Sequence, residues 1–148
     1  MQFRETTNAL GGAATSTELS ATPMNNLFDD VTAGEASAGM TDYRAFDVYN
    51  ESGSTVTGVE IYMSSETTSS DTQLDFGIEG SPVGSTTAIG NDGTAPSGVT
   101  FAHATSASTL SLPDIPAGSY ARVWVRRVVS SGAVNTSNDS GTIEVVYA

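Results

Sequence analysis

The single histidine, His103, is the first place to look for chemistry, because a Ser–His–Asp relay needs an imidazole as its base. It stands in the stretch Phe101-Ala102-His103-Ala104, which has the character of a strand, and small polar residues follow it. The sequence contains no Gly-x-Ser-x-Gly elbow that would present a nucleophilic serine. We therefore interpret His103 as an ordinary strand or loop residue and predict that the protein is not an enzyme.

Carboxylates are the second source of chemistry, since 17 of the 148 residues are Asp or Glu. Paired acids cleave glycosides, and loop carboxylates bind calcium. The candidates are Asp29, Asp30, Asp71, Asp75, Asp92 and Asp139. Most of them lie in predicted turns, where Asp side chains bind nearby amides. The loops at 91–94 and 138–140 offer oxygens for calcium but lack the Asp-x-Asp-x-Asp-Gly spacing. We predict no catalytic residue, no metal and no cofactor.

The net charge of −12 excludes several partners. All five basic residues are arginine, and so acidic a surface repels nucleic acid and anionic membranes. The absence of cysteine excludes disulfides and thiolate sites. No apolar run has the length of a membrane helix, and the first residues lack the pattern of a secretion signal. We expect a soluble protein synthesised in a host cytoplasm, without nucleic-acid or membrane partners.

The elements that position these residues begin at Asp42, where apolar and polar residues start to alternate. A period of two is typical of half-buried antiparallel strands. The predicted strands cover 43–50, 59–64, 74–79, 99–102, 109–112, 119–129 and 142–147, with a further weak one at 86–89 inside a glycine-rich excursion from 80 to 98. Seven or eight short strands predict an all-β antiparallel sandwich over 42–148, either immunoglobulin-like or a jelly roll.

Residues 1–41 show neither a strand period nor a helix period. One local signal favours a helical turn: Thr22 can cap it, and Pro23 suits the first helical position. We predict that residues 1–41 form an extended N-terminal arm with at most that short turn. A segment of this length without regular structure is unusual in a compact monomer, and the simplest explanation is that the arm lies on another subunit.

The strand over 119–129 carries three of the five arginines. Alternation places Val123 and Val125 in the core, so Trp124 and Arg126 share the outer face. Exposed Trp beside Arg is typical of interface hot spots, which predicts a docking surface for an acidic partner. The alternative is that Trp124 is covered by the N-terminal arm while the arginines neutralise nearby acids. The predicted interface residues are Phe3, Leu10, Leu27, Phe28, Trp124, Arg126 and Arg127.

Several short motifs are familiar in their order and spacing. They are Asn26-Leu27-Phe28-Asp29-Asp30-Val31, Glu35, Tyr43-Arg44, Asn50, Ala95-Pro96-Ser97-Gly98-Val99-Thr100-Phe101, Val123-Trp124-Val125-Arg126-Arg127 and Asn138-Asp139. With them the chain resembles, from about Leu10 to its end, a family of small structural proteins of tailed bacteriophages and prophages. The sequence departs from that family by lacking lysine.

The resemblance implies a component of the virion and no catalytic residues. Within that class we expect a decoration (cement) protein that binds the major capsid protein on the outer capsid surface and bridges neighbouring subunits, as a dimer or trimer. Two other hypotheses stay open: a tail- or fibre-associated sandwich, and a carbohydrate-binding module with Tyr43 and Tyr49, or Tyr62 and Trp124, as its aromatic platform.

Overall fold

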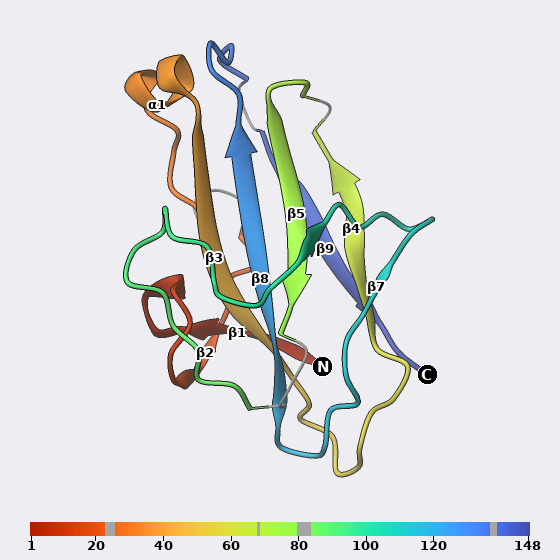
Figure 1. Ribbon diagram of the computed structural model, residues 1–148. Helices are drawn as coiled ribbons and strands as arrows, with labels where there is room; N and C mark the ends of the chain where they lie inside the picture. Colours follow the sequence, from red (N-terminus) through yellow and green to blue (C-terminus); the bar gives the residue numbers. More distant parts are fainter. Residues whose placement is uncertain (23–25, 68, 80–83, 137–138) are drawn as a thin grey trace.

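The computed structural model describes residues 1–22, 26–67, 69–79, 84–136 and 139–148. Within these residues the chain forms nine strands, one short α-helix and one 3₁₀ turn. The strands lie in two antiparallel sheets that face each other (Figure 1). The predicted all-β antiparallel sandwich is therefore confirmed.

The larger sheet has six strands in the order β2-β1-β3-β8-β5-β6. Its members are β1 (Gln2–Thr6), β2 (Ala14–Glu18), β3 (Met40–Tyr49), β5 (Thr72–Ile78), β6 (Phe101–Ala102) and β8 (Tyr120–Val129). The ten-residue strands β3 and β8 pair along their whole length, and β5 pairs with the other edge of β8. β8 is thus the central element of the sheet, and its side chains have neighbours on both sides.

The smaller sheet has three strands in the order β7-β4-β9. They are β4 (Glu60–Glu66), β7 (Leu110–Ser111) and β9 (Gly141–Val146). A register shift between Met63 and Ser65 interrupts the β4–β9 pairing. In Figure 1, β9 crosses behind β5 and β4 lies to the right of them, with the C-terminus just beyond β9.

The hydrophobic core lies between the two sheets. It contains Phe46, Val48, Val59, Ile61, Met63, Phe76, Ala104, Leu112, Ile115, Ala121, Val123 and Val125. These residues come from alternate positions of β3, β4, β5 and β8 and from the segments beside β7. Burying one face of each strand is what the two-residue period in the sequence predicts.

The extended arm predicted for residues 1–41 is not found. Residues 2–6 pair with β3 as β1, and β2 then extends the sheet outward. β1 is held by more than its backbone, because the Phe3 ring packs edge-on against Phe46 at 5.4 Å and the Thr6 hydroxyl donates to the Ala45 carbonyl at 3.0 Å. Only Thr6 of β1 is fully buried, and β2 at the sheet margin is mostly exposed, so the two strands carry almost no apolar alternation.

The described helix is α1 (Ala33–Ala38), which begins at a capping box. The Glu35 amide donates to the Thr32 hydroxyl, and the Glu35 carboxylate accepts from the Thr32 amide at 2.8 Å. The helical turn predicted near Thr22 has residues 23–25 outside the described part of the chain. None of the helices described here has the length and apolar character that crossing a bilayer requires.

The capping box makes α1 sensitive to acid. Its hydrogen bonds from Thr32, first from the amide and then from the hydroxyl, lower the pKa of Glu35 below the usual 4.5. A lowered folded-state pKa contributes stability above the unfolded value and loses it as the pH falls through the folded pKa. We expect the amide exchange of Ala36 to accelerate, relative to the rest of the chain, below about pH 4.5.

A Glu35→Gln variant keeps an acceptor but does not titrate, so its relative Ala36 exchange should not change with pH. Amide exchange followed by NMR checks both proteins. An equal response of the two would show that the carboxylate does not hold the helix end.

Candidate functional site

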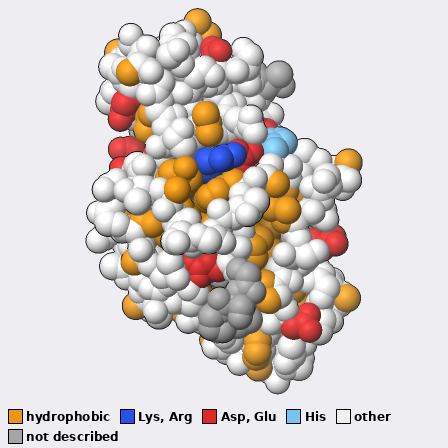
Figure 2. Space-filling view, in the orientation of Figure 1, with side chains coloured by type: hydrophobic (Ala, Val, Ile, Leu, Met, Phe, Trp, Pro, Cys, Tyr) orange, Lys and Arg blue, Asp and Glu red, His pale blue; other side chains and the backbone are white. Residues whose placement is uncertain are grey.

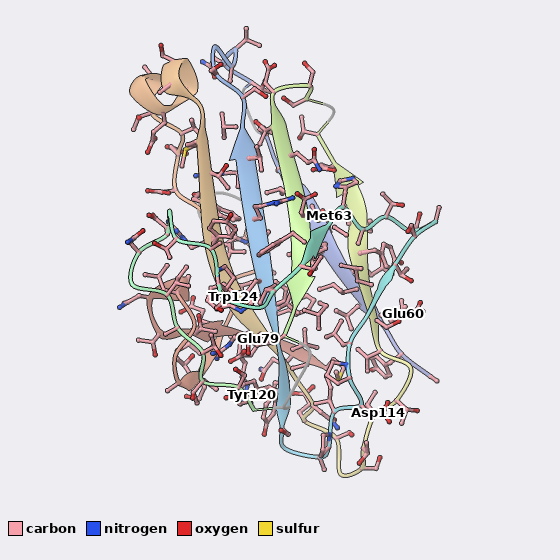
Figure 3. All side chains as sticks on the ribbon, in the orientation of Figure 1. Glu60, Met63, Glu79, Asp114, Tyr120 and Trp124 are labelled. Atoms are coloured by element: carbon pink, nitrogen blue, oxygen red, sulfur yellow. The ribbon has the colours of Figure 1, made fainter. Side chains whose placement is uncertain are left out.

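The predicted contact strand, β8, has the two faces that alternation predicts. Ala121, Val123 and Val125 point into the core between the sheets. Trp124 points to the other side, where it forms a second, smaller cluster with Ala45. Figure 3 shows Trp124 on β8 with Glu79, which follows β5, beside it.

The prediction that Trp124 is exposed is wrong, because its side chain is completely buried. Leu10, Ile89, Val99 and Phe101 pack around it. Its indole N–H donates to the Glu79 carboxylate at 2.7 Å. The alternative interpretation, a tryptophan covered in part by the N-terminal segment, agrees with this arrangement, although Ile89, Val99 and Phe101 of the cover come from other parts of the chain.

The cover over Trp124 consists of two segments that bind each other. The Gly12 amide donates to the Thr87 carbonyl at 2.8 Å, and the Ile89 amide donates to the Leu10 carbonyl at 3.0 Å. Gly11 has φ +81°, and a Cβ there would lie 2.1 Å from the Thr87 carbonyl oxygen and 3.0 Å from the Trp124 ring. Only glycine allows this close approach.

Each arginine of β8 pairs with an aspartate on the neighbouring strand. Arg122 lies opposite Asp47 and Arg127 opposite Asp42 in the β3–β8 register. Both are two-point contacts: 3.0 and 3.1 Å for Arg122–Asp47, and 3.1 and 2.9 Å for Arg127–Asp42. The paired side chains are almost wholly inaccessible to solvent. These two ion pairs therefore link β3 and β8 within the protein.

Arg126 makes the equivalent contact on the other side of β8. It lies opposite Asp75 of β5, and its Nη2 is 2.6 Å from the Asp75 carboxylate. Unlike its neighbours Arg122 and Arg127, Arg126 keeps 33% of its side chain exposed. Figure 2 shows that basic side chains reach the visible face in one small area, bordered by apolar and acidic ones.

Asp42 and Asp47, two of the buried carboxylates, lie where burial disfavours their charged form. Burial raises the pKa of Asp47 and of Asp42, and the hydrogen bonds and charge of Arg122 and Arg127 oppose that rise. Removing water from a carboxylate disfavours its charged form, whereas a guanidinium beside it favours that form. The ionisation of Asp42 and Asp47 therefore depends on the arginines beside them.

The remaining arginines also have partners within the chain. Arg44 lies 3.0 Å from Asp92 and 3.6 Å from Asp29. The Arg4 guanidinium stacks 3.3 Å above the Tyr49 ring. The alternative proposed from the sequence, that arginines neutralise nearby acids, is thus confirmed for the three arginines of β8 and holds for Arg44 as well.

His103 follows β6, where the chain leaves the larger sheet. Its Nδ1 donates to the Leu74 carbonyl at 2.8 Å, and its Nε2 lies 3.4 Å from the Glu66 carboxylate. Asp75, 4.0 Å from the ring, is already bound by Arg126. The imidazole therefore connects the segment after β6 to β5 and lies next to the end of β4. Within the described residues, no three histidine, aspartate or glutamate side chains gather closely enough to hold a metal ion.

The predicted calcium loops divide into a described and an undescribed one. The Asp92 carboxylate points at Arg44, and the Asn91 side chain accepts from the Thr94 hydroxyl at 3.0 Å. The side-chain oxygens of this first loop are thus bound by groups of the same chain. The second loop begins at Asn138, which lies outside the described residues. We identify no arrangement of ligands for calcium in the first loop.

The other predicted interface residues pack against their own chain. Phe3, Leu27 and Phe28 are half-buried at the margin of the main core, and Leu10 lies over Trp124. The Phe28 ring lies 4.7 Å from the Arg127 guanidinium carbon. These side chains cover open sides of the sandwich, so only part of each is exposed to a partner.

The aromatic platforms proposed for a carbohydrate-binding module are altered by this packing. A platform of Tyr62 and Trp124 does not exist, since Trp124 is buried. Tyr43 packs against Phe101 at 5.4 Å, and Arg4 covers Tyr49. Neither of the two predicted residue pairs therefore forms a platform of two open rings.

The exposed apolar surface lies elsewhere, at the end of β9. Among the described residues, the large hydrophobic side chains that are exposed are Val134, Val146 and Tyr147. Two of the three belong to β9 or follow it directly. An open groove of about 350 Å³ beside them is lined by Met1, Phe3, Ile143, Glu144, Val145 and Tyr147.

Sequence reasoning missed this surface, although one signal was present. The last strand has one acidic residue, Glu144, among apolar ones, has no proline, and belongs to a chain without lysine. Proline and lysine are residues that usually protect an open sheet edge.

No family model, no curated protein and no solved structure matches the chain.

Proposed function

We propose that this chain is a non-enzymatic structural protein of a tailed-phage particle, a decoration protein that binds the outer capsid surface. It would contact the major capsid protein and stabilise the shell by bridging neighbouring subunits. Many weak contacts repeated over a shell add up through multivalency. The motifs that resemble small phage structural proteins lead to this proposal.

The distribution of charge is the observation that supports it best. Arg44, Arg122, Arg126 and Arg127 are each paired with aspartates of the same chain. In contrast, Glu18, Glu60, Asp114 and Glu144 have no ion-pair partner among the described residues. A net charge of −12 is thus carried on the outside. Such a surface favours attachment to a basic partner and keeps coated particles apart in solution.

The proposal predicts that purified protein binds expanded shells that lack it. We expect saturable binding at micromolar concentration and a melting temperature of the shell that rises with occupancy, because a ligand that binds only the intact lattice stabilises it. Sedimentation with the shells and calorimetry measure the two effects. Unexpanded shells are the control, since the neighbouring sites are spaced differently there.

Absence of binding to expanded shells at micromolar concentration would contradict the proposal. Counting copies in purified particles separates it from a tail protein, because a decoration protein is present in far more copies. Sedimentation of the unbound protein tests the predicted dimer or trimer in the same preparation.

A further inference from the structure

β9 is an open sheet edge of unusual composition. It pairs with β4 only, so its other edge has no strand beside it in the described structure. The edge strands β6 and β7 are two residues long, and β2 is polar. β9 has six residues and ends in the exposed Val146, followed by the half-exposed Tyr147. An edge of this kind is a template for a further strand.

The two faces of β9 present different surfaces to such a strand. On the inner face, Ile143 and Val145 pack against the core, and they line the groove together with Phe3. On the outer face, Glu144 lies opposite Tyr62, and Val146 lies opposite Glu60. An added strand would therefore meet apolar side chains on the inner face and, on the outer face, the Glu144 carboxylate next to Val146.

We propose that the free edge of β9 binds an extended segment of a partner protein in which apolar residues alternate with lysine or arginine. The segment would add a fourth strand to the smaller sheet, with its apolar side chains over the groove and a basic one beside Glu144. Main-chain hydrogen bonds supply affinity in this mode, and the alternate side chains supply specificity. The inference does not depend on the proposed function.

A second copy of this chain does not fit the same edge. Each β9 strand carries Glu144 and no basic residue, so pairing two of them adds like charge without any compensating charge, and like charges across strands are destabilising. The arginines that would compensate are engaged elsewhere: Arg44, Arg122, Arg126 and Arg127 pair with their own aspartates. Charge complementarity therefore selects a basic partner.

The test uses the full chain and a blocked peptide in which valine and lysine alternate. We expect the peptide to bind, to slow the amide exchange of residues 143–147, and to bind more weakly as salt is raised. A peptide in which valine and glutamate alternate should not bind. A basic peptide interrupted by prolines should not bind either, because it cannot form the ladder.

Charge variants locate the site. Glu144→Lys is expected to weaken binding of the basic peptide by at least tenfold, equivalent to about 1.4 kcal/mol. Glu144→Gln keeps an acceptor for the Tyr62 hydroxyl and should give an intermediate loss. Glu18→Lys is the matched control, since it makes the same charge change on the exposed edge strand β2 and should leave the affinity within twofold, or about 0.4 kcal/mol.

Three results would overturn the inference: equal losses from Glu144→Lys and Glu18→Lys, exchange protection on β2 in place of β9, or a β9-mediated dimer of the free protein. The outcome is separable from that of the proposed function. If shells bind and Glu144→Lys does not weaken that binding or that of the peptide, only the edge proposal fails. If the peptide binds at β9 and expanded shells do not bind, only the capsid proposal fails.

Discussion

Replacing Arg122 by methionine is expected to destabilise the fold by about 3–5 kcal/mol at pH 7, because it leaves a buried carboxylate without its partner. Asp47 is completely inaccessible to solvent, and both of its oxygens accept from Arg122. For a chain of this size, the loss corresponds to a fall in melting temperature of roughly ten degrees or more. Urea unfolding followed by circular dichroism measures it.

The destabilisation should shrink as the pH is lowered from 7 to about 4. Without Arg122, the hydrogen bonds and charge that lower the pKa of Asp47 are gone, so burial raises it further. An acid whose folded pKa is raised contributes stability below its unfolded pKa, about 3.9, and loses it as the pH rises through the folded value. The deficit relative to the natural sequence is therefore greatest at neutral pH.

Two companion variants make this prediction specific. Asp47→Leu leaves a buried arginine that does not titrate in this range, so its deficit should persist at pH 4. The double variant R122M/D47L should recover most of the stability, since replacing a buried ion pair by apolar residues is often neutral or favourable. A loss below about 1 kcal/mol in Arg122→Met, or a loss independent of pH, would show that the pair does not hold the strands.

The sequence predicts the body of the sandwich well, because burial of one strand face leaves a period of two. β3, β4, β5, β8 and β9 were all expected within a few residues of their bounds. The sequence also contains a signal for the register between β3 and β8, which the sequence analysis does not use. Asp42 and Asp47 have the same spacing as Arg122 and Arg127. In antiparallel strands, that equality brings both pairs opposite each other at once.

The sequence does not predict what covers a strand. Alternation places Trp124 correctly on the outer face of β8, but the cover comes from Leu10 and from the loop that holds Ile89. Those residues are far from Trp124 in sequence, and no local pattern links them. For the same reason β1 and β2, which bury few side chains, look like an arm.

Helix α1 shows a different reason for an error. Its signal, Thr32 followed three residues later by Glu35, is a capping box that can be read directly from the sequence. The predicted turn rests on Thr22 and Pro23 alone, and the prediction for residues 1–41 does not include the capping box at Thr32. The interaction surface at β9 required knowledge of the sheet order, since only an edge position leaves Glu144 and Val146 available to a partner.

Truncating Trp124 to alanine is expected to cost about 3–5 kcal/mol, the usual range for removing a buried aromatic side chain. The loss should be accompanied by local opening, because the indole is the surface on which Leu10, Ile89 and Phe101 pack. We expect the amide of Ile89, which is bound to the Leu10 carbonyl, to exchange much faster. Amide exchange and thermal unfolding measure the two effects separately.

Trp124→Phe is the matched control, since it keeps an aromatic ring but cannot donate to Glu79. It should cost about 1.5–3 kcal/mol at most, the range for a hydrogen bond to a charged group, and leave the exchange of Ile89 near its original rate. If Ile89 exchanges no faster in Trp124→Ala, another contact holds the cover. Because Trp124 lies in the larger sheet and β9 in the smaller one, the alanine variant should still bind the basic peptide below its melting temperature. Loss of that binding in a folded Trp124→Ala protein would mean that the two sheets are coupled, and that the β9 edge depends on the cover on the far side of the sandwich.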